Sequence, residues 1–230
     1  MIDLKNDVMI SSEPVPWMSY KIEKDMVDHL WKIVKEGRKK NNCVKNTLVG
    51  QISESFALID ENNHYTNEVL IPLAHHYIRE FRLPYPTLPF FMDKNYNMME
   101  VKQHTFMLKS IWGNYQYKHE FNPLHNHTGF LSFVVWLKIP YDEKSQSEIP
   151  FLKGTNDNSK FAGKFTFVHN DLMGMVRDSS FPIRDDDEGR MLMFPSELMH
   201  MVYPFYGTDE ARVSISGNLM HGYKFDCIKT

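Results

Sequence analysis

The sequence is poor in the features that mark several large classes of protein. It has only two cysteines, Cys43 and Cys227, among 230 residues, and neither lies in a CxxC pair. Two cysteines cannot form a disulfide framework, so a reducing compartment is the simpler setting. No apolar run approaches the roughly 20 residues that a membrane-spanning helix needs. A disulfide scaffold and a helical membrane protein are therefore not expected.

Basic charge is not concentrated anywhere along the chain. Lysine and arginine number 26 against 29 acidic residues, and they are spread over the sequence rather than gathered in a stripe. Binding to a nucleic-acid backbone needs such a stripe, so neither nucleic-acid nor membrane binding is indicated. The opening MIDLKNDVMI lacks the basic region and apolar stretch of a signal peptide, so we expect a cytoplasmic protein.

The composition is that of a folded protein, with helices expected in the first part of the chain. Hydrophobic residues make up 42% and aromatic residues 13%, which suffices for one well-buried core. Residues 20–40 have apolar side chains at helical spacing, with Ser19 as a candidate N-cap. Residues 65–82 predict a second helix, and the three prolines of 83–91 predict a connection.

After about residue 98 the pattern changes to short apolar runs separated by turn residues. Many short strands of this kind indicate a sandwich or barrel rather than a parallel sheet with crossover helices. We therefore expect one domain over 1–230, with 1–97 as mostly helical support and 98–230 as the β core. The expected strands are 99–108, 110–117, 131–139, 164–168, 190–194, 200–203 and 212–219.

The most informative stretch is FNPLHNH, in which His125 and His127 are two residues apart. In an extended chain such residues point to the same face, so both imidazoles can converge on one point. Neutral imidazole is a common ligand of iron, zinc and copper. An HxH pair also occurs by chance in histidine-rich loops. Because two ligands hold a metal poorly, we expect a third from elsewhere in the fold.

His200 is the best candidate for this third ligand, since it follows the apolar run at 191–194 and lies near the end of a predicted strand. A histidine flanked by methionines can equally be a buried core residue. Further on, Arg212 opens the alternating run RVSIS, where it faces either solvent or a buried anion. Its rigid fork suits a carboxylate, and Ser214 would point the same way and could add a hydroxyl donor.

Three motifs together resemble the Fe(II)- and 2-oxoglutarate-dependent oxygenase superfamily. They are HNHTGFLSFVVWLKIPY (125–141), GRMLMFPSELMHMVYP (189–204) and RVSISGN (212–218). More narrowly, they are similar to small oxygenase-like proteins of bacteriophages and marine bacteria. A phage-encoded protein of this kind would act in the cytoplasm of the host. The resemblance implies a jelly-roll-like double-stranded β-helix. It also implies an oxidoreductase, a 2-oxoglutarate-dependent dioxygenase that couples decarboxylation of 2-oxoglutarate to succinate with hydroxylation of a substrate.

The resemblance also implies roles for individual residues. Fe(II) would be held by His125 and His200, while Arg212 would pair with the distal carboxylate of 2-oxoglutarate, assisted by Ser214. Most members carry an acid two residues after the first histidine, whereas this chain has His127 there.

Three readings of this departure stay open. In the first, which we favour, His127 is itself the third ligand. In the second, a carboxylate such as Asp171 or Glu120 replaces the missing acid, and in the third, water or a halide fills the position.

The sequence leaves the rest of the site and the substrate open. Trp112, Asn114, Trp136 and Asn218 are candidates to line the pocket, although packing roles suit them equally, and no catalytic residue is indicated beyond the metal site. One alternative function is a cupin-type three-histidine metalloenzyme that does not use 2-oxoglutarate. Another is a non-enzymatic β-sandwich, such as a binding module or virion protein. Besides 2-oxoglutarate and oxygen, the expected partner is an unidentified primary substrate, and the oligomeric state stays open.

Overall fold

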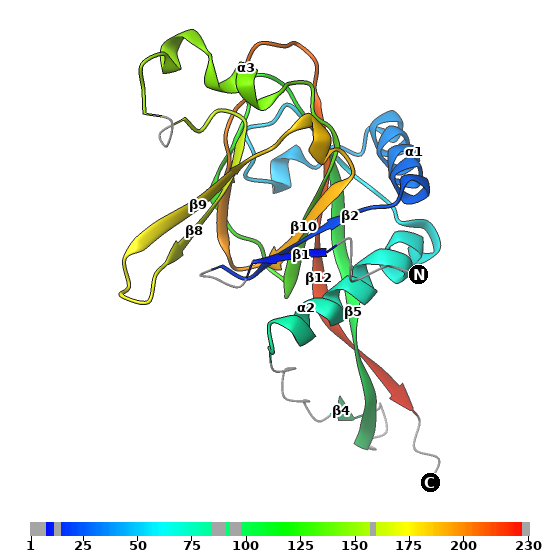
Figure 1. Ribbon diagram of the computed structural model, residues 1–230. Coiled ribbons are helices and arrows are strands. Elements are labelled where there is room, and N and C mark those ends of the chain that lie inside the picture. Colours follow the sequence, from blue (N-terminus) through cyan, green and yellow to red (C-terminus); the bar gives the residue numbers. More distant parts are fainter. Residues whose placement is uncertain (1–7, 12–14, 84–90, 93–97, 157–159, 227–230) are drawn as a thin grey trace.

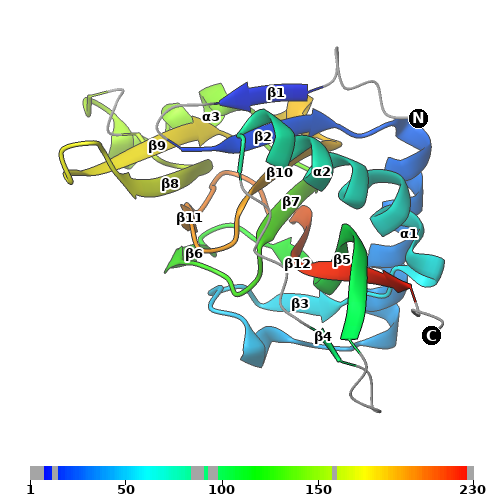
Figure 2. The same ribbon diagram turned by 90° about the horizontal axis from the view of Figure 1, so that it is seen from below.

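The computed structural model describes residues 8–11, 15–83, 91–92, 98–156 and 160–226. Most of the fold consists of two antiparallel sheets (Figures 1 and 2). The large sheet has the order β1 (Val8–Ser11), β2 (Trp17–Lys21), β10 (Arg190–Pro195), β7 (Leu131–Lys138), β12 (Arg212–Asp226), β5 (Met98–Gln116) and β3 (Glu54–Ala57), with β4 (Phe91–Met92) paired to β5. The small sheet has the order β6 (Asn122–His125), β11 (Met199–Val202), β8 (Lys164–Asn170) and β9 (Val176–Pro182).

The two sheets face each other across a layer of aromatic and aliphatic side chains. Trp136 and Phe194 of the large sheet belong to one buried cluster with Phe165 and Phe167 of the small sheet. Burial of these rings removes large apolar areas from water and joins the sheets. The mainly β, jelly-roll-like double-stranded β-helix that the sequence predicts is thereby confirmed.

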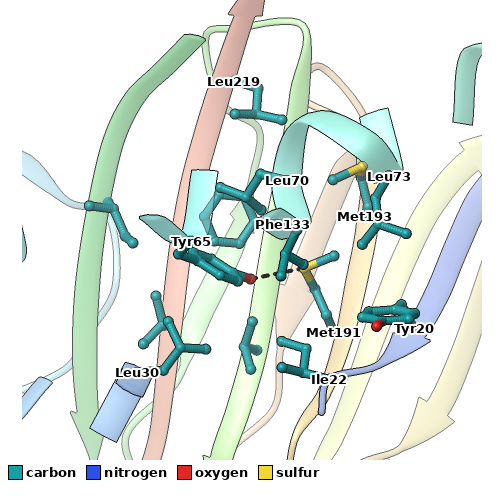
Figure 3. Close-up of a cluster of buried hydrophobic side chains, with 14 of the residues drawn as sticks. Tyr20, Ile22, Leu30, Tyr65, Leu70, Leu73, Phe133, Met191, Met193 and Leu219 are labelled. Atoms are coloured by element: carbon teal, nitrogen blue, oxygen red, sulfur yellow. Dashed lines mark hydrogen bonds between the residues drawn. The ribbon is translucent and has the colours of Figure 1, made fainter. Parts of the chain in front are cut away.

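Helices cover the outer face of the large sheet, as Figure 2 shows for α1 (Lys24–Lys40) and α2 (Ile71–Glu80). A second buried cluster joins them to the strands, and Figure 3 shows its centre, where the Tyr65 hydroxyl donates to Met191 Sδ at 3.1 Å. Strand β7 lies between the two clusters and is buried at seven consecutive positions. Its nearly continuous apolar sequence follows from this burial on both faces.

The helical predictions are partly wrong at the first helix. Ser19 is not an N-cap, because residues Trp17–Lys21 form β2 and pair with β10, and α1 begins only at Lys24. The buried Ser19 hydroxyl accepts a hydrogen bond from Arg190 at 3.1 Å. Pairing with a distant strand thus overrides the local helical spacing.

The second helix is confirmed, although its first turns, η3 (Thr66–Leu70), are π-helical before α2 begins. The shorter helices are α3 (Glu143–Ser147), η1 (Lys45–Thr47), η2 (Glu61–Asn63), η4 (Pro150–Leu152) and η6 (Asp185–Asp187). In the described part of the chain no helix has the length and apolar character needed to cross a membrane. Within the proline-rich stretch, 84–90 lie outside the described residues.

The predicted strands of the core are confirmed, with two corrections. The expected pair 99–108 and 110–117 is one continuous strand, β5, and β12 continues beyond its predicted end to Asp226. These two strands pair from Arg212 opposite Gln116 to Asp226 opposite Glu100, with two register shifts, one between Asn218 and Leu219 and one between Lys224 and Phe225. Long mutual pairing holds the strands extended through positions that look like breaks in the sequence.

Candidate metal centre and anion site

Three histidines converge at the edge of the small sheet. His125, at the end of β6, lies directly opposite His200 of β11 in the antiparallel register. His127 follows two residues later, and its backbone N–H donates to the Ser196 carbonyl at 2.8 Å. One nitrogen from each ring lies within 4.8 Å of the other two, as a single metal ion requires. The structure thus brings together the three residues that the sequence suggests as ligands, while their ligation of a metal stays a prediction.

Backbone carbonyls fix the orientation of two of these rings. His125 Nδ1 lies 2.7 Å from the Pro123 carbonyl oxygen, and His200 Nδ1 lies 2.8 Å from that of Leu198. Because a carbonyl oxygen only accepts, each Nδ1 carries the proton and donates it. The lone pair of each ring is then on Nε2, which is the arrangement usual for histidines that bind metals.

Burial keeps the three imidazoles neutral. Desolvation lowers the pKa of His127 to about 4 and that of His200 to about 3, and it also lowers the pKa of His125. Neighbouring histidines add to the effect, since a second positive charge close by is unfavourable. At neutral pH all three rings are in the unprotonated form that a metal ion needs. A set of three imidazoles suits Fe(II), as it does other divalent transition metals.

Aromatic rings close the cluster off from solvent on one side. Phe165 stacks on His200 with ring centroids 5.6 Å apart and planes 11° apart, and Phe194 meets the same ring edge-on at 4.9 Å. The Trp112 ring lies 5.6 Å from that of His127. His200 is only 3% exposed as a result. Such packing restricts the ring to one orientation and excludes water from behind it.

A cavity of about 570 Å³ joins this cluster to the residues predicted for co-substrate binding. The three histidines line it, and so do Arg212 and Ser214 on β12. Alternate residues of a strand share one face, so the same side of β12 faces the cavity over several positions. The predicted pocket residues also line it: Trp112, Asn114, Trp136 and Asn218.

Arg212 is the most unusual residue of the cavity wall. Its side chain is only 1% exposed, yet no carboxylate lies within 4.0 Å of it anywhere in the described ranges. One terminal nitrogen donates to the Tyr141 hydroxyl, and the other donates to Gln116 Oε1 at 2.6 Å. The Phe205 ring covers it, with its centroid 5.4 Å from the guanidinium carbon. A buried cation with only neutral partners is costly unless an anion joins it, so this arrangement suits a bound carboxylate.

Some polar side chains of the cavity wall are already hydrogen-bonded within the protein, whereas Ser214 is not. Asn114 Oδ1 accepts from Ser55 at 2.7 Å, and Asn218 Oδ1 accepts from Ser132 at 2.7 Å. These amides therefore support the wall. Ser214 makes no side-chain hydrogen bond to any residue that the structure describes, so its hydroxyl is free to donate to a ligand.

The two carboxylates considered as replacement ligands lie outside the cluster. Asp171 is in the β8–β9 turn, where it accepts from two backbone N–H groups and pairs with Arg177 at 2.8 Å. Glu120 accepts from the backbone N–H groups of Ser53 and Tyr117. Among the described residues, the metal-binding group contains no acid. This placement favours His127 over either acid as the third ligand.

Two residues of the anion site, Gln116 and Tyr141, were missed from the sequence. Gln116 lies directly opposite Arg212 in the register of β5 and β12, and Tyr141 follows the end of β7. Gln116 stands outside the three motifs, and Tyr141 only ends the first of them, without a role that the resemblance assigns. Only the pairing of strands that are far apart in the sequence brings them to the guanidinium.

Comparisons with known proteins agree with this site. Residues 110–218 match the profile of a family described as "Putative 2OG-Fe(II) oxygenase". A search of curated protein sequences gives no significant match. Among solved structures, a Pseudomonas putida prolyl-4-hydroxylase is 14% identical, with 90% of this chain and 93% of that chain covered and a TM-score of 0.49.

Two further structures are similar at the same low level. A Trichoplax adhaerens prolyl hydroxylase, solved with a peptide fragment of a hypoxia-inducible factor, is 13% identical, with 91% and 83% of the chains covered and a TM-score of 0.44. A Burkholderia pseudomallei oxidoreductase of the 2OG-Fe(II) oxygenase family is 16% identical, with 50% and 44% covered and a TM-score of 0.35. Similarity this weak carries no conclusion about a substrate, and the narrower resemblance to phage and marine proteins stays a prediction.

The family match thus spans the segment that holds the three histidines, Arg212 and Ser214. Over residues 110–218, just under half of the chain, the protein is thus similar to the 2OG-Fe(II) oxygenase family, whose members use Fe(II) and 2-oxoglutarate.

Proposed function

We propose that this oxygenase hydroxylates its substrate, with Fe(II) held by His125, His127 and His200 and the distal carboxylate of 2-oxoglutarate held by Arg212. The observation that carries the proposal is the pairing of two features in one cavity. Three neutral imidazoles converge on one point, and a fully buried guanidinium without an acidic partner in the described chain lines the same space. A metal site and a carboxylate site side by side are what a metal-bound 2-oxo acid needs.

His125, His127 and His200 would hold the ion and leave room beside it for the co-substrate. When bound, Fe(II) supplies the redox chemistry that activates oxygen. For hydroxylation the overall reaction balances as substrate, 2-oxoglutarate and oxygen giving hydroxylated substrate, succinate and carbon dioxide. The hard chemistry belongs to the metal, while the protein binds, orients and excludes water.

Named residues of this chain account for the binding, the orientation and the exclusion of water. The carbonyls of Pro123 and Leu198 engage Nδ1 of two imidazoles, so that Nε2 is the nitrogen of each ring that would bind the ion. Arg212 would fix the far end of 2-oxoglutarate through two parallel charge-assisted hydrogen bonds, and Ser214 could add a third. The aromatic rings around His200 keep that side of the cavity dry, which strengthens every charged interaction inside it.

The two alternatives make different demands on the same residues. A cupin-type three-histidine enzyme that does not use 2-oxoglutarate would leave the buried charge of Arg212 without a role. A non-enzymatic β-sandwich would have no use for converging, neutral imidazoles with preset tautomers. Neither alternative explains both features, and we retain one domain over 1–230 as part of the proposal.

Formation of succinate tests the proposal. Purified protein with Fe(II), oxygen and 2-oxoglutarate is expected to form succinate, slowly alone and faster when a candidate substrate is added. The His200→Ala variant serves as the blank, because free iron in the buffer also decomposes 2-oxo acids. Equal succinate from parent and blank with every substrate class tried would contradict the proposed activity.

The role of His127 gives a separate prediction. His127→Asp is expected to keep metal binding, because it restores the acid found at this position in most of the superfamily. His127→Ala should weaken binding of Mn(II) measurably, since one of three ligands is lost. Calorimetric titration of Mn(II) into both variants and the parent measures the difference. An unchanged affinity in the alanine variant would assign the third position to solvent or to another residue.

A further inference from the structure

Arg212 meets a neutral partner at a position where an acid would fit. Gln116 is 4% exposed, lies opposite Arg212 in the strand register and lines the same cavity. Its Oε1 accepts from the guanidinium at 2.6 Å. Glutamate has almost the same shape and would form an internal ion pair there. The chain instead satisfies one N–H of the arginine without cancelling its charge.

A second hydrogen bond, on the side of the Gln116 amide away from Arg212, fixes the orientation of this amide. Gln116 Nε2 donates to the backbone carbonyl of Glu120 at 2.6 Å. A carbonyl accepts only and a guanidinium donates only, so the amide has one arrangement that satisfies both. The turn that presents this carbonyl is held by the Glu120 carboxylate, which accepts from the N–H groups of Tyr117 and Ser53.

We propose that Gln116 is a positioning residue that holds Arg212 in place while leaving its full positive charge for the co-substrate. The inference rests on the proposed function, because it takes the anion to be the distal carboxylate of 2-oxoglutarate. A neutral acceptor uses one N–H donor of the guanidinium and leaves its positive charge uncancelled. An acid in the same place would compete with the incoming carboxylate for the same guanidinium.

Two substitutions separate charge from support. Gln116→Glu keeps an acceptor for Arg212 but neutralises it, and it should weaken 2-oxoglutarate binding by about tenfold or more. Gln116→Met has a similar volume, removes the acceptor and leaves the charge intact, so it should weaken binding only by roughly two- to fivefold. If Gln116 merely supported the arginine, the order would reverse, because glutamate supports it better than methionine.

The measurement is calorimetric titration of 2-oxoglutarate into Mn(II)-loaded protein without oxygen. Gln51→Glu is the matched control, because it makes the same change in net charge at an exposed position outside the cavity lining, and it should bind like the parent. Mn(II) affinity, measured in the same way, should be the same in all four proteins and shows that each is folded around its metal site.

The outcomes distinguish this inference from the function on which it rests. Binding by Gln116→Glu that equals or exceeds binding by Gln116→Met would overturn the role of charge. If the glutamate variant fails to fold, a loss of more than about tenfold in Gln116→Met would overturn it instead, since support alone would then explain the residue. A parent that binds no 2-oxoglutarate would overturn the proposed function, and this inference with it.

Discussion

Replacing His200 with alanine is expected to abolish tight uptake of Fe(II) or Mn(II), whereas the parent is expected to bind about one ion per chain. His200 is the most buried of the three candidate ligands, and its Nε2 is aimed by the Leu198 carbonyl. Its removal leaves at most two imidazoles, which hold a divalent ion poorly. Calorimetric titration of Mn(II) into the metal-free proteins measures the effect.

The matched control is His169→Ala, which removes a histidine from the neighbouring strand β8. His169 contacts the Ser179 hydroxyl at 3.1 Å and lies outside the metal-binding group. This variant should bind Mn(II) as the parent does. A His200→Ala protein that took up Mn(II) with the affinity of the parent would show that the proposed site is wrong.

Replacing Arg212 with alanine is expected to weaken 2-oxoglutarate binding by about 30-fold to several thousand-fold. Truncating one partner of a desolvated ion pair costs roughly 2–5 kcal/mol, because the other charge stays buried without a partner. Arg212→Lys offers a point charge in place of the fork and should retain part of the affinity. Titration of 2-oxoglutarate into the Mn(II)-loaded variants without oxygen measures both effects.

Metal affinity supplies the internal control for this prediction. Arg212 makes its described hydrogen bonds to Tyr141 and Gln116 and none to the three histidines, so Mn(II) binding should barely change in either variant. A cupin-type enzyme without 2-oxoglutarate would show no co-substrate effect. A structural sandwich would show only a change in melting temperature. Equal binding of 2-oxoglutarate by parent and Arg212→Ala would contradict the assignment of the anion site.

The parts of the site that could be predicted are those encoded by short local patterns. His125 and His127 share a face because of their two-residue spacing, and Arg212 and Ser214 share one for the same reason. His200 was nominated as the third ligand because it lies near the end of a predicted strand, and the family resemblance supported that choice. Its register opposite His125 depends on pairing across the small sheet, which no local pattern reveals.

The parts that could not be predicted depend on contacts between distant segments. Gln116 became a partner of Arg212 only through the long register of β5 and β12. Ser19 looked like a helix cap because it is a common capping residue type and the apolar residues at helical spacing begin just after it, with Ile22. Strand β9, which is largely exposed at the edge of the small sheet, has too few apolar side chains to be recognised alone. In each case tertiary pairing decides what the local sequence leaves open.

The most direct test of the account is whether the cavity binds a metal and a dicarboxylate together. Anaerobic calorimetry would compare 2-oxoglutarate with 2-oxovalerate, which has the same 2-oxo acid group but lacks the distal carboxylate. We predict one 2-oxoglutarate bound per chain in the Mn(II)-loaded protein, much weaker binding of 2-oxovalerate, and much weaker binding of 2-oxoglutarate when the metal is removed. Equal affinity for the two acids, or no binding of 2-oxoglutarate by the loaded protein, would contradict the account.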